Sequence, residues 1–140
     1  MHLVEKIIAL KAVEFFASAD EDLLAEIAAS VVEQTVAPGG TIIESGMVDA
    51  SMFVVARGRV RVVPVDGAPL ELGPGAVFGE LAALDPQPRS ASVSTVTETV
   101  LLRIAHSTVV DLMSEHIEIA HGIIRFLIRR YGRREHVAAQ

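Results

Sequence analysis

Cysteine is absent from the 140 residues of this sequence. This absence excludes disulfide bonds, thiolate metal sites and cysteine nucleophiles, and it fits a protein of a reducing compartment such as the cytoplasm. Tryptophan is also absent, and only one tyrosine and five phenylalanines are present. Because 51% of the residues are nevertheless hydrophobic, the core has to consist mainly of Val, Ile, Leu and Ala.

Long apolar runs are also missing. None approaches the roughly 20 residues of a membrane-spanning helix, so we expect no membrane insertion by this chain.

Basic residues are outnumbered, with 12 Lys and Arg against 18 Asp and Glu, and the net charge is −6. An acidic chain without a wide basic face is a poor candidate for binding nucleic acid. The length is typical of one domain, and we expect a single domain over residues 1–140.

Three segments differ in their residue patterns. Residues 1–30 space their apolar side chains as helices do. Residues 31–105 break into short β-branched and apolar runs separated by turn residues, and residues 106–135 again favour helices. Many short strands between helical segments predict a mainly β fold, a sandwich or barrel with flanking helices.

Local signals refine the first two segments. Ser18 followed by Glu21 has the form of a helix capping box. Met52 to Val55 is a continuous apolar run, and Asp66-Gly67 is a strong hairpin turn signal.

In the last segment, Ser107 is expected to cap a short helix through Met113, and a longer helix is expected from about Glu115 to Arg134, with a basic end. The apolar residues of this longer helix occupy more than one stripe, so the helix needs two contacts. The second contact is either a dimer partner or fused domain, or the N-terminal helices if the helix is wedged between them and the barrel.

The stretch after Gly73 contains the residues of this sequence that are most typical of a binding site. Gly79 allows the backbone to come close to a ligand. Glu80 to Leu84 can form one short helical turn, whose first N–H groups would favour an anion. Asp85 and Pro86 then end this turn.

A cation follows within ten residues. Pro88 stiffens the chain before Arg89, whose guanidinium fork can meet a phosphate with two hydrogen bonds. Ser90 adds a hydroxyl donor, and the small Ala91 lets the backbone approach the same oxygens. The carboxylate of Glu80 is an acceptor suited to a sugar hydroxyl. The turn therefore combines a cation that suits a phosphate with an acceptor that suits a sugar hydroxyl.

This sequence, F-G-E-L-A-A-L-D-P-Q-P-R-S-A-S-V over residues 78–93, resembles the phosphate-binding cassette of the cyclic nucleotide-binding domain family. That family includes catabolite activator proteins, kinase regulatory subunits and cyclic nucleotide-gated channels. Residues 42–46 and 52–58 resemble the family's early strands, and the C-terminal helices resemble its hinge and lid helices. The resemblance implies an eight-stranded jelly-roll β-barrel with N-terminal helices and C-terminal hinge and lid helices.

The resemblance also implies roles for individual residues. Glu80 would accept the ribose 2′-OH, and Arg89 would pair with the cyclic phosphate. Close contacts and the pocket floor would come from Phe78, Gly79, Leu81, Ala82, Ser90 and Ala91. A lid contact over the base is expected from Leu127, Arg130 or Tyr131. No cofactor and no metal ion is implied; His116 and His121, five residues apart, have the wrong spacing for one helix face.

Two departures from the family pattern accompany the match. Met47 and Asp49 stand in a loop where the family usually has other residues, and we expect that loop to lie away from the phosphate turn. Glu14 stands where the family often has proline.

The function implied is a regulatory module that binds a cyclic nucleotide and is not an enzyme. Ser90 favours cAMP, because cGMP-selective members often carry threonine there. Ligand binding would be transmitted through the C-terminal helix to a fused or partner output domain. One alternative is a degenerate, ligand-free domain that forms homodimers or other contacts through the C-terminal helix, with Glu80 and Arg89 as a structural ion pair. Another is a fragment of a transcription regulator that has lost its DNA-binding part.

Overall fold

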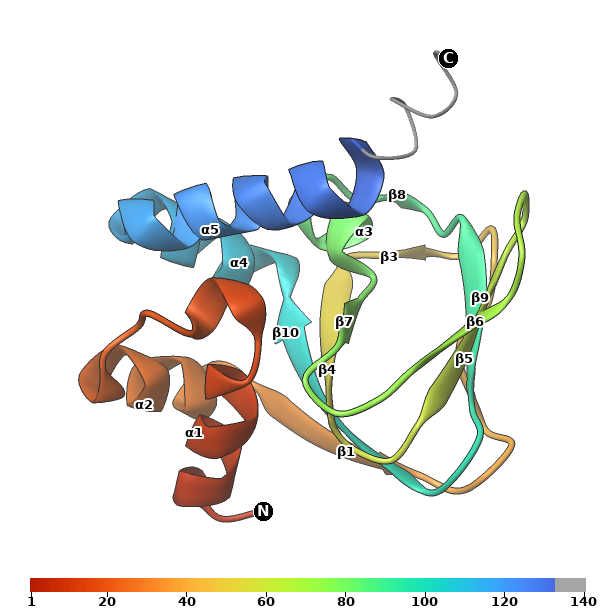
Figure 1. Ribbon diagram of the computed structural model, residues 1–140, viewed down its shortest axis with the longest axis horizontal. Coiled ribbons are helices and arrows are strands. Elements are labelled where there is room, and N and C mark those ends of the chain that lie inside the picture. The colour runs from red at the N-terminus through yellow and green to blue at the C-terminus, as the bar shows by residue number, and fades with distance from the viewer. Residues whose placement is uncertain (133–140) are drawn as a thin grey trace.

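The computed structural model describes residues 1–132, and three helices open the chain (Figure 1). They are α1 (Leu3–Lys11), the 3-10 helix η1 (Glu14–Phe16) and α2 (Glu21–Ser30). The expected capping box at Ser18 is wrong. Asp20 caps α2 instead, since its carboxylate accepts a hydrogen bond of 2.8 Å from the N–H of Leu23.

The β segment consists of short antiparallel strands. They are β1 (Val32–Val36), β2 (Thr41–Ile43), β3 (Val48–Asp49), β4 (Ser51–Arg57), β5 (Val60–Pro64), β6 (Leu70–Leu72), β7 (Val77–Phe78), β8 (Gln87–Pro88), β9 (Ala91–Thr95) and β10 (Thr99–Ala105). Two four-stranded sheets have the orders β1-β10-β4-β7 and β2-β9-β5-β6, and β3 pairs with β8 separately. The expected mainly β jelly-roll class with flanking helices is confirmed, and the β3–β8 pair is additional to its eight strands.

The hairpin expected at Asp66-Gly67 is present. Strands β5 and β6 pair antiparallel, with Val62 opposite Leu70, and the turn lies between them. The single helical turn expected in the cassette is also present, as helix α3 (Glu80–Leu84).

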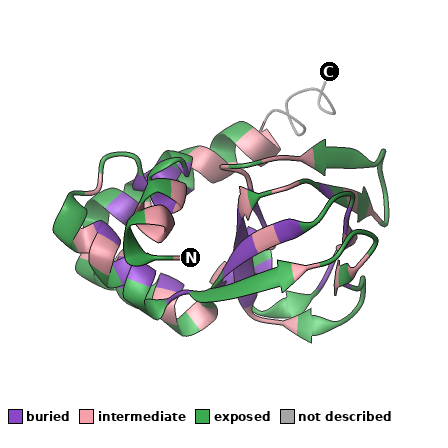
Figure 2. Ribbon diagram, turned by 90° about the horizontal axis from the view of Figure 1, so that it is seen from below, coloured by how far each residue is buried: buried purple, intermediate pink, exposed green. Residues whose placement is uncertain are grey.

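Strand β4 explains why its apolar run is continuous rather than alternating. Met52 and Val54 belong to the core between the sheet and the helices, whereas Phe53 and Val55 belong to the core inside the barrel. The strand is therefore buried on both faces. Buried residues gather where the helices meet the barrel (Figure 2). Inside the barrel, Phe53 stacks on Phe78 with ring centroids 5.2 Å apart.

The C-terminal segment contains the expected short helix followed by a longer helical stretch. They are α4 (His106–Glu115), then α5 (Ile117–Leu127), which continues into the π-helical turn η2 (Ile128–Gly132). Ser107 does not cap α4. The helix begins at His106, so Ser107 lies within its first turn and Ala105 occupies the N-cap position. Residues 133–135 of the expected helical segment lie outside the described residues.

The junction between α4 and α5 is a single residue. His116 has an extended backbone (φ −131°, ψ 97°), which ends α4 and lets α5 start in a new direction. No glycine or proline marks this junction. The change of direction allows α5 to pack Ile119 and Ile123 into the helical core.

Helix α5 lies against the N-terminal helices, as the wedged arrangement predicts. Gly122 approaches η1 so closely that an added Cβ would lie 3.1 Å from the Cβ of Phe15. The rings of Phe15 and Phe126 meet edge to face at 5.3 Å. The opposite side of the same segment leaves Ile117, Ile124 and Ile128 exposed. Within residues 1–132, no helix is long and apolar enough to cross a membrane.

Candidate functional site

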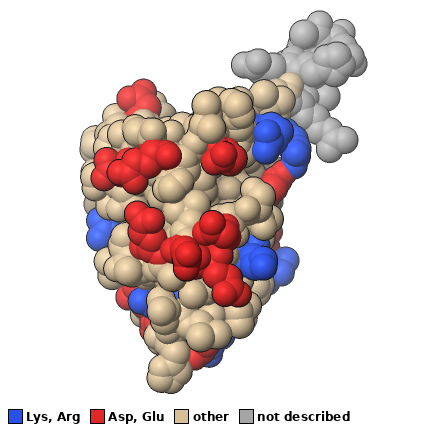
Figure 3. All heavy atoms as spheres, turned by 90° about the vertical axis from the view of Figure 1, so that its left-hand side faces the viewer, with Lys and Arg blue, Asp and Glu red and all other residues tan. Residues whose placement is uncertain are grey.

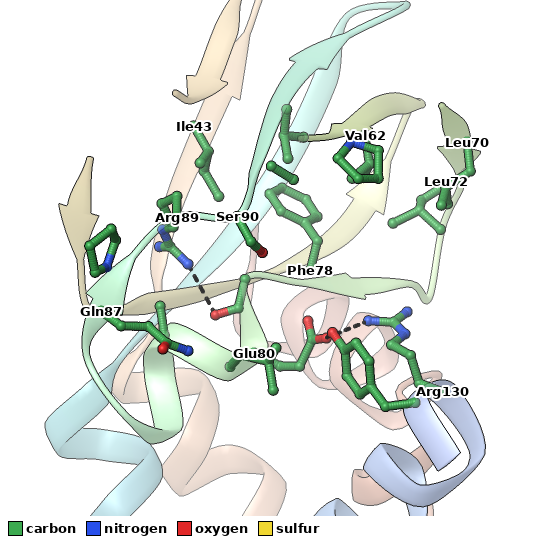
Figure 4. Close-up of a pocket in the computed structure, with 18 residues that line it drawn as sticks. Ile43, Val62, Leu70, Leu72, Phe78, Glu80, Gln87, Arg89, Ser90 and Arg130 are labelled. Atoms are coloured by element: carbon green, nitrogen blue, oxygen red, sulfur yellow. Dashed lines mark hydrogen bonds and ion pairs between the residues drawn. The ribbon is translucent and has the colours of Figure 1, made fainter. Parts of the chain in front are cut away.

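A cavity of about 300 Å³ lies between the barrel, α3 and η2 (Figure 4). Apolar side chains of the barrel, among them Val62, Leu70 and Leu72, form one wall. The opposite wall carries the polar groups of the cassette. Ten of the eleven residues expected at the site line this cavity: Phe78, Gly79, Glu80, Leu81, Ala82, Arg89, Ser90, Ala91, Arg130 and Tyr131.

Leu127 is the exception. It is half-buried against the core of the helical layer and does not line the cavity. The π-helical turn begins directly after it, and two residues of that turn, Arg130 and Tyr131, reach the cavity instead.

Gly79 sets the shape of the cassette. Its φ of +77° lies in the left-handed region, which glycine adopts without the steric cost that a Cβ imposes. A Cβ on Gly79 would also lie 2.7 Å from Nη1 of Arg89 and 3.0 Å from the carbonyl oxygen of Ser51. Both the backbone conformation and the close approach therefore require glycine between β7 and α3.

Arg89 is held beneath the cassette and is only 6% exposed. Its Nη1 donates to the carbonyl oxygen of Gly79 at 3.1 Å, and its Nη2 donates to the carbonyl oxygen of Ser51 at 2.6 Å and to Oδ2 of Asp49 at 3.0 Å. Its Nε is buried and has no hydrogen-bond partner within the described part of the chain. A buried donor without a partner is costly, so this N–H is an unsatisfied group in a residue that lines the cavity.

The loop that contains Met47 and Asp49 lies against Arg89, so the expectation that it lies away from the phosphate turn is wrong. The N–H of Arg89 donates to the carbonyl oxygen of Met47 at 2.8 Å, and the N–H of Gly46 donates to the carbonyl oxygen of Arg89 at 2.8 Å. The β3–β8 pair, in which Val48 lies opposite Pro88, fixes this register. Sequence reasoning missed Asp49 because 40 residues separate it from its partner.

The charge of Asp49 is stabilised by this contact. Burial raises the pKa of the Asp49 carboxyl. Hydrogen bonds from Arg89 and from the N–H of Ala50, together with the positive charges of Arg89 and Arg103, lower this pKa by more than burial raises it. The net result is a pKa below the ordinary value of 3.8. Asp49 is therefore an ionised partner that fixes the guanidinium at neutral pH.

Glu80 is also buried, with 4% of its surface exposed, and its partners come from η2. Its Oε1 lies 3.0 Å from Nη1 of Arg130 and accepts a short hydrogen bond from the hydroxyl of Tyr131. Arg130 also donates to the carbonyl oxygen of Val77 at 2.8 Å and lies over the ring of Phe126 at 4.6 Å. The cavity carboxylate is thus tied to the end of the C-terminal helical segment.

Glu80 and Arg89 do not pair with each other. The ion-pair partner of Glu80 is Arg130, and that of Arg89 is Asp49. The structural ion pair expected for a degenerate domain is therefore not formed. Ser90 is exposed at the cavity, and its hydroxyl makes no hydrogen bond within residues 1–132.

Away from this cavity, the described residues contain one group of side chains with metal-ligand chemistry. One ligand atom each of Glu26, Glu115 and His116 lies within 4.8 Å of the others. Glu26 belongs to α2, and Glu115 and His116 stand at the α4–α5 junction. Figure 3 shows that carboxylates gather on one face of the molecule. Two of the three are exposed, and exposed acidic groups commonly gather without an ion, so this group defines no site.

Comparisons with known proteins agree with the fold. Residues 33–116 match the sequence profile of the Cyclic nucleotide-binding domain. A cyclic nucleotide-gated potassium channel of Rhizobium etli is 37% identical over 121 residues, which are 86% of this chain and 34% of that protein. A Cyclic AMP receptor protein of Thermus thermophilus is 32% identical over 111 residues, 75% of this chain and 51% of that protein.

The N-terminal domain of a transcriptional regulator from Streptomyces coelicolor A3(2) has a similar crystal structure. Its TM-score is 0.72 at 31% identity, and the match covers 94% of this chain and 95% of that one. The chain therefore belongs to the cyclic nucleotide-binding domain family. It spans about a third of the length of the channel and half of the length of the receptor protein.

Proposed function

We propose that the cavity binds a cyclic nucleotide, cAMP in preference to cGMP, and that the chain is a regulatory module rather than an enzyme. The observation that carries this proposal is the buried Nε–H of Arg89, which lacks a partner among residues 1–132 and lies beside a cavity that also contains the buried carboxylate of Glu80. One group suits a phosphate, and the other suits a sugar hydroxyl.

The phosphate contact would use the donors of Arg89 that the protein leaves free. A guanidinium has five N–H groups, and three of them are directed to Gly79, Ser51 and Asp49. The two that remain include Nε–H, and the exposed hydroxyl of Ser90 belongs to the next residue in the chain. Because the other three bonds fix the guanidinium, little side-chain entropy would be lost on binding an anion.

The ribose contact would fall to Glu80. A carboxylate accepts up to about four hydrogen bonds, so the partners already on Oε1 leave capacity for a 2′-OH donor. The base would then lie against the apolar wall of the barrel, where Val62, Leu70 and Leu72 offer contact without hydrogen-bond readout. Preference for adenine rests on Ser90, which takes the place of the threonine of cGMP-selective members.

Transmission would pass through η2 and α5. Arg130 and Tyr131 connect the cavity carboxylate to the C-terminal helical segment. A ligand that contacts Glu80 would change the contacts that hold η2, and it can shift this segment only as far as its affinities for the two arrangements differ. The output domain would be fused to the chain or supplied by a partner, and the cytoplasm remains a prediction from the cysteine-free composition.

Calorimetric titration of the ligand-free domain with cAMP, cGMP and 5′-AMP tests the proposal. Mass spectrometry first establishes that no nucleotide co-purifies. The proposal expects micromolar or tighter binding of cAMP, weaker binding of cGMP, and the weakest binding of 5′-AMP, which lacks the cyclic phosphate. No heat with any of the three nucleotides would refute it.

A ligand-free dimerisation module is the second candidate, and the exposed isoleucines of the C-terminal segment favour it. Ile117, Ile124 and Ile128 are 64%, 48% and 63% exposed, and their spacing of seven and four residues places them on one helix face. A second copy of this chain would bury that face. Sedimentation of the wild type and of Ile124→Glu distinguishes the two candidate functions. The dimerisation module requires a wild-type dimer that nucleotide does not affect and that dissociates in the variant.

A further inference from the structure

His106 makes two contacts at the start of α4, outside the set of residues that line the cavity. Its Nδ1 forms a short hydrogen bond with the carbonyl oxygen of Ala83 in α3. Its backbone N–H donates to the carbonyl oxygen of Ala50 at 2.7 Å. The side chain is half-buried and does not line the cavity, so it would not touch a ligand directly.

The two partners of His106 belong to the two halves of the proposed site. Ala83 lies in the short helix that begins with Glu80. Ala50 lies between Asp49 and Ser51, the two residues that accept hydrogen bonds from Nη2 of Arg89. One residue of α4 therefore contacts both the segment that presents the carboxylate and the segment that holds the guanidinium.

The chemistry of the side-chain contact is directional. A carbonyl oxygen only accepts, so the ring must carry a proton on Nδ1 to make this bond. The carbonyls in the last turn of a helix have no partner inside the helix. Since α3 has five residues, external contacts decide where it lies.

We infer that His106 is a positioning residue for the cyclic-nucleotide site, acting through the Nδ1–H bond to Ala83 and the backbone bond to Ala50. This inference rests on the proposed function. Loss of the side-chain bond would let α3 shift relative to the segment that holds Arg89, and displacements of about 1 Å in a binding site are costly. We expect roughly a tenfold loss of cyclic-nucleotide affinity, from one net hydrogen bond.

The test compares His106→Leu with His106→Asn. Asparagine carries its amide nitrogen on Cγ, as histidine carries Nδ1, so it can donate to the same carbonyl oxygen, whereas leucine cannot. Each protein is titrated with cAMP. Amide hydrogen exchange of the ligand-free proteins is measured in peptides that cover residues 46–52 and 80–85.

The inference expects His106→Leu to lose about tenfold in affinity and to exchange faster in both peptides, with His106→Asn close to wild type. Wild-type behaviour of the leucine variant, or an asparagine variant as impaired as leucine, would overturn it. If the leucine variant does not fold, the asparagine variant decides by retaining or losing affinity. If wild type binds no nucleotide, the proposed function fails, and hydrogen exchange alone still decides whether His106 positions the two segments.

Discussion

Nη2 of Arg89 lies 3.0 Å from Oδ2 of Asp49, across 40 residues of sequence. The arginine side chain is 4% exposed, and the aspartate side chain is 34% exposed. The pair therefore has one partner in the protein interior and the other at its edge. Because the second hydrogen of Nη2 goes to Ser51, the guanidinium has a fixed orientation, and its Nε has no partner within residues 1–132.

The Asp49→Asn substitution should change how the free energy of unfolding depends on pH. The pKa of Asp49 is lower in the folded chain than its ordinary value of 3.8, so the unfolded chain takes up the proton first as the pH falls. The stabilisation is fully present above pH 3.8 and is lost as the pH falls through the folded pKa. Urea unfolding from about pH 6 to about pH 2 should show a stability difference between wild type and variant that shrinks in acid. A difference that stays constant over this range would show that Asp49 does not stabilise the fold through its charge.

Glu80→Gln should impair binding through the ribose hydroxyl. Wild type should bind 2′-deoxy-cAMP about 10- to 100-fold more weakly than cAMP, because a hydrogen bond to a charged group contributes about 1.5–3 kcal/mol. In the Glu80→Gln variant the two ligands should differ much less, since the strong acceptor is gone. Titration of both proteins with both ligands forms a double-mutant cycle. Additive losses would place the 2′-OH away from Glu80.

Arg130→Ala and Arg129→Ala are neighbouring changes with different expected effects. Arg130 lines the cavity and pairs with Glu80, so its loss should raise the rate of cAMP dissociation roughly tenfold. Arg129 does not line the cavity and pairs with Glu14 in an exposed contact, which is worth little. Its variant should dissociate at the wild-type rate. Stopped-flow displacement of a fluorescent cAMP analogue measures both rates. Equal rates in the two variants would show that Arg130 does not help to hold the ligand.

The cassette could be predicted because Phe78 to Ala91 is continuous in sequence, and its short helix, with a glycine directly before it, follows from local residue types. Asp49 could not, because only the register of β3 with β8 brings it to Arg89. Its acidic side chain in an unusual loop was the one available signal.

The C-terminal segment shows the same limit. Its division into a short and a longer helix could be predicted, and Arg130 and Tyr131 line the cavity as expected. Leu127 was also expected there but packs against the helical core. The π-helical turn that begins after Leu127 changes which residues face the cavity, and no helix-breaking residue announces it. The roles of these residues in binding remain a proposal.

The most direct measurement of the central claim is the affinity of Arg89→Lys for cAMP, beside wild type and Arg61→Lys. Lysine keeps the positive charge and loses the planar fork, whereas Arg61 is an exposed arginine of β5 outside the cavity. The account predicts that Arg89→Lys loses about 100-fold or more in affinity while Arg61→Lys binds as wild type does. Equal affinity of all three proteins for cAMP would contradict a phosphate site at Arg89.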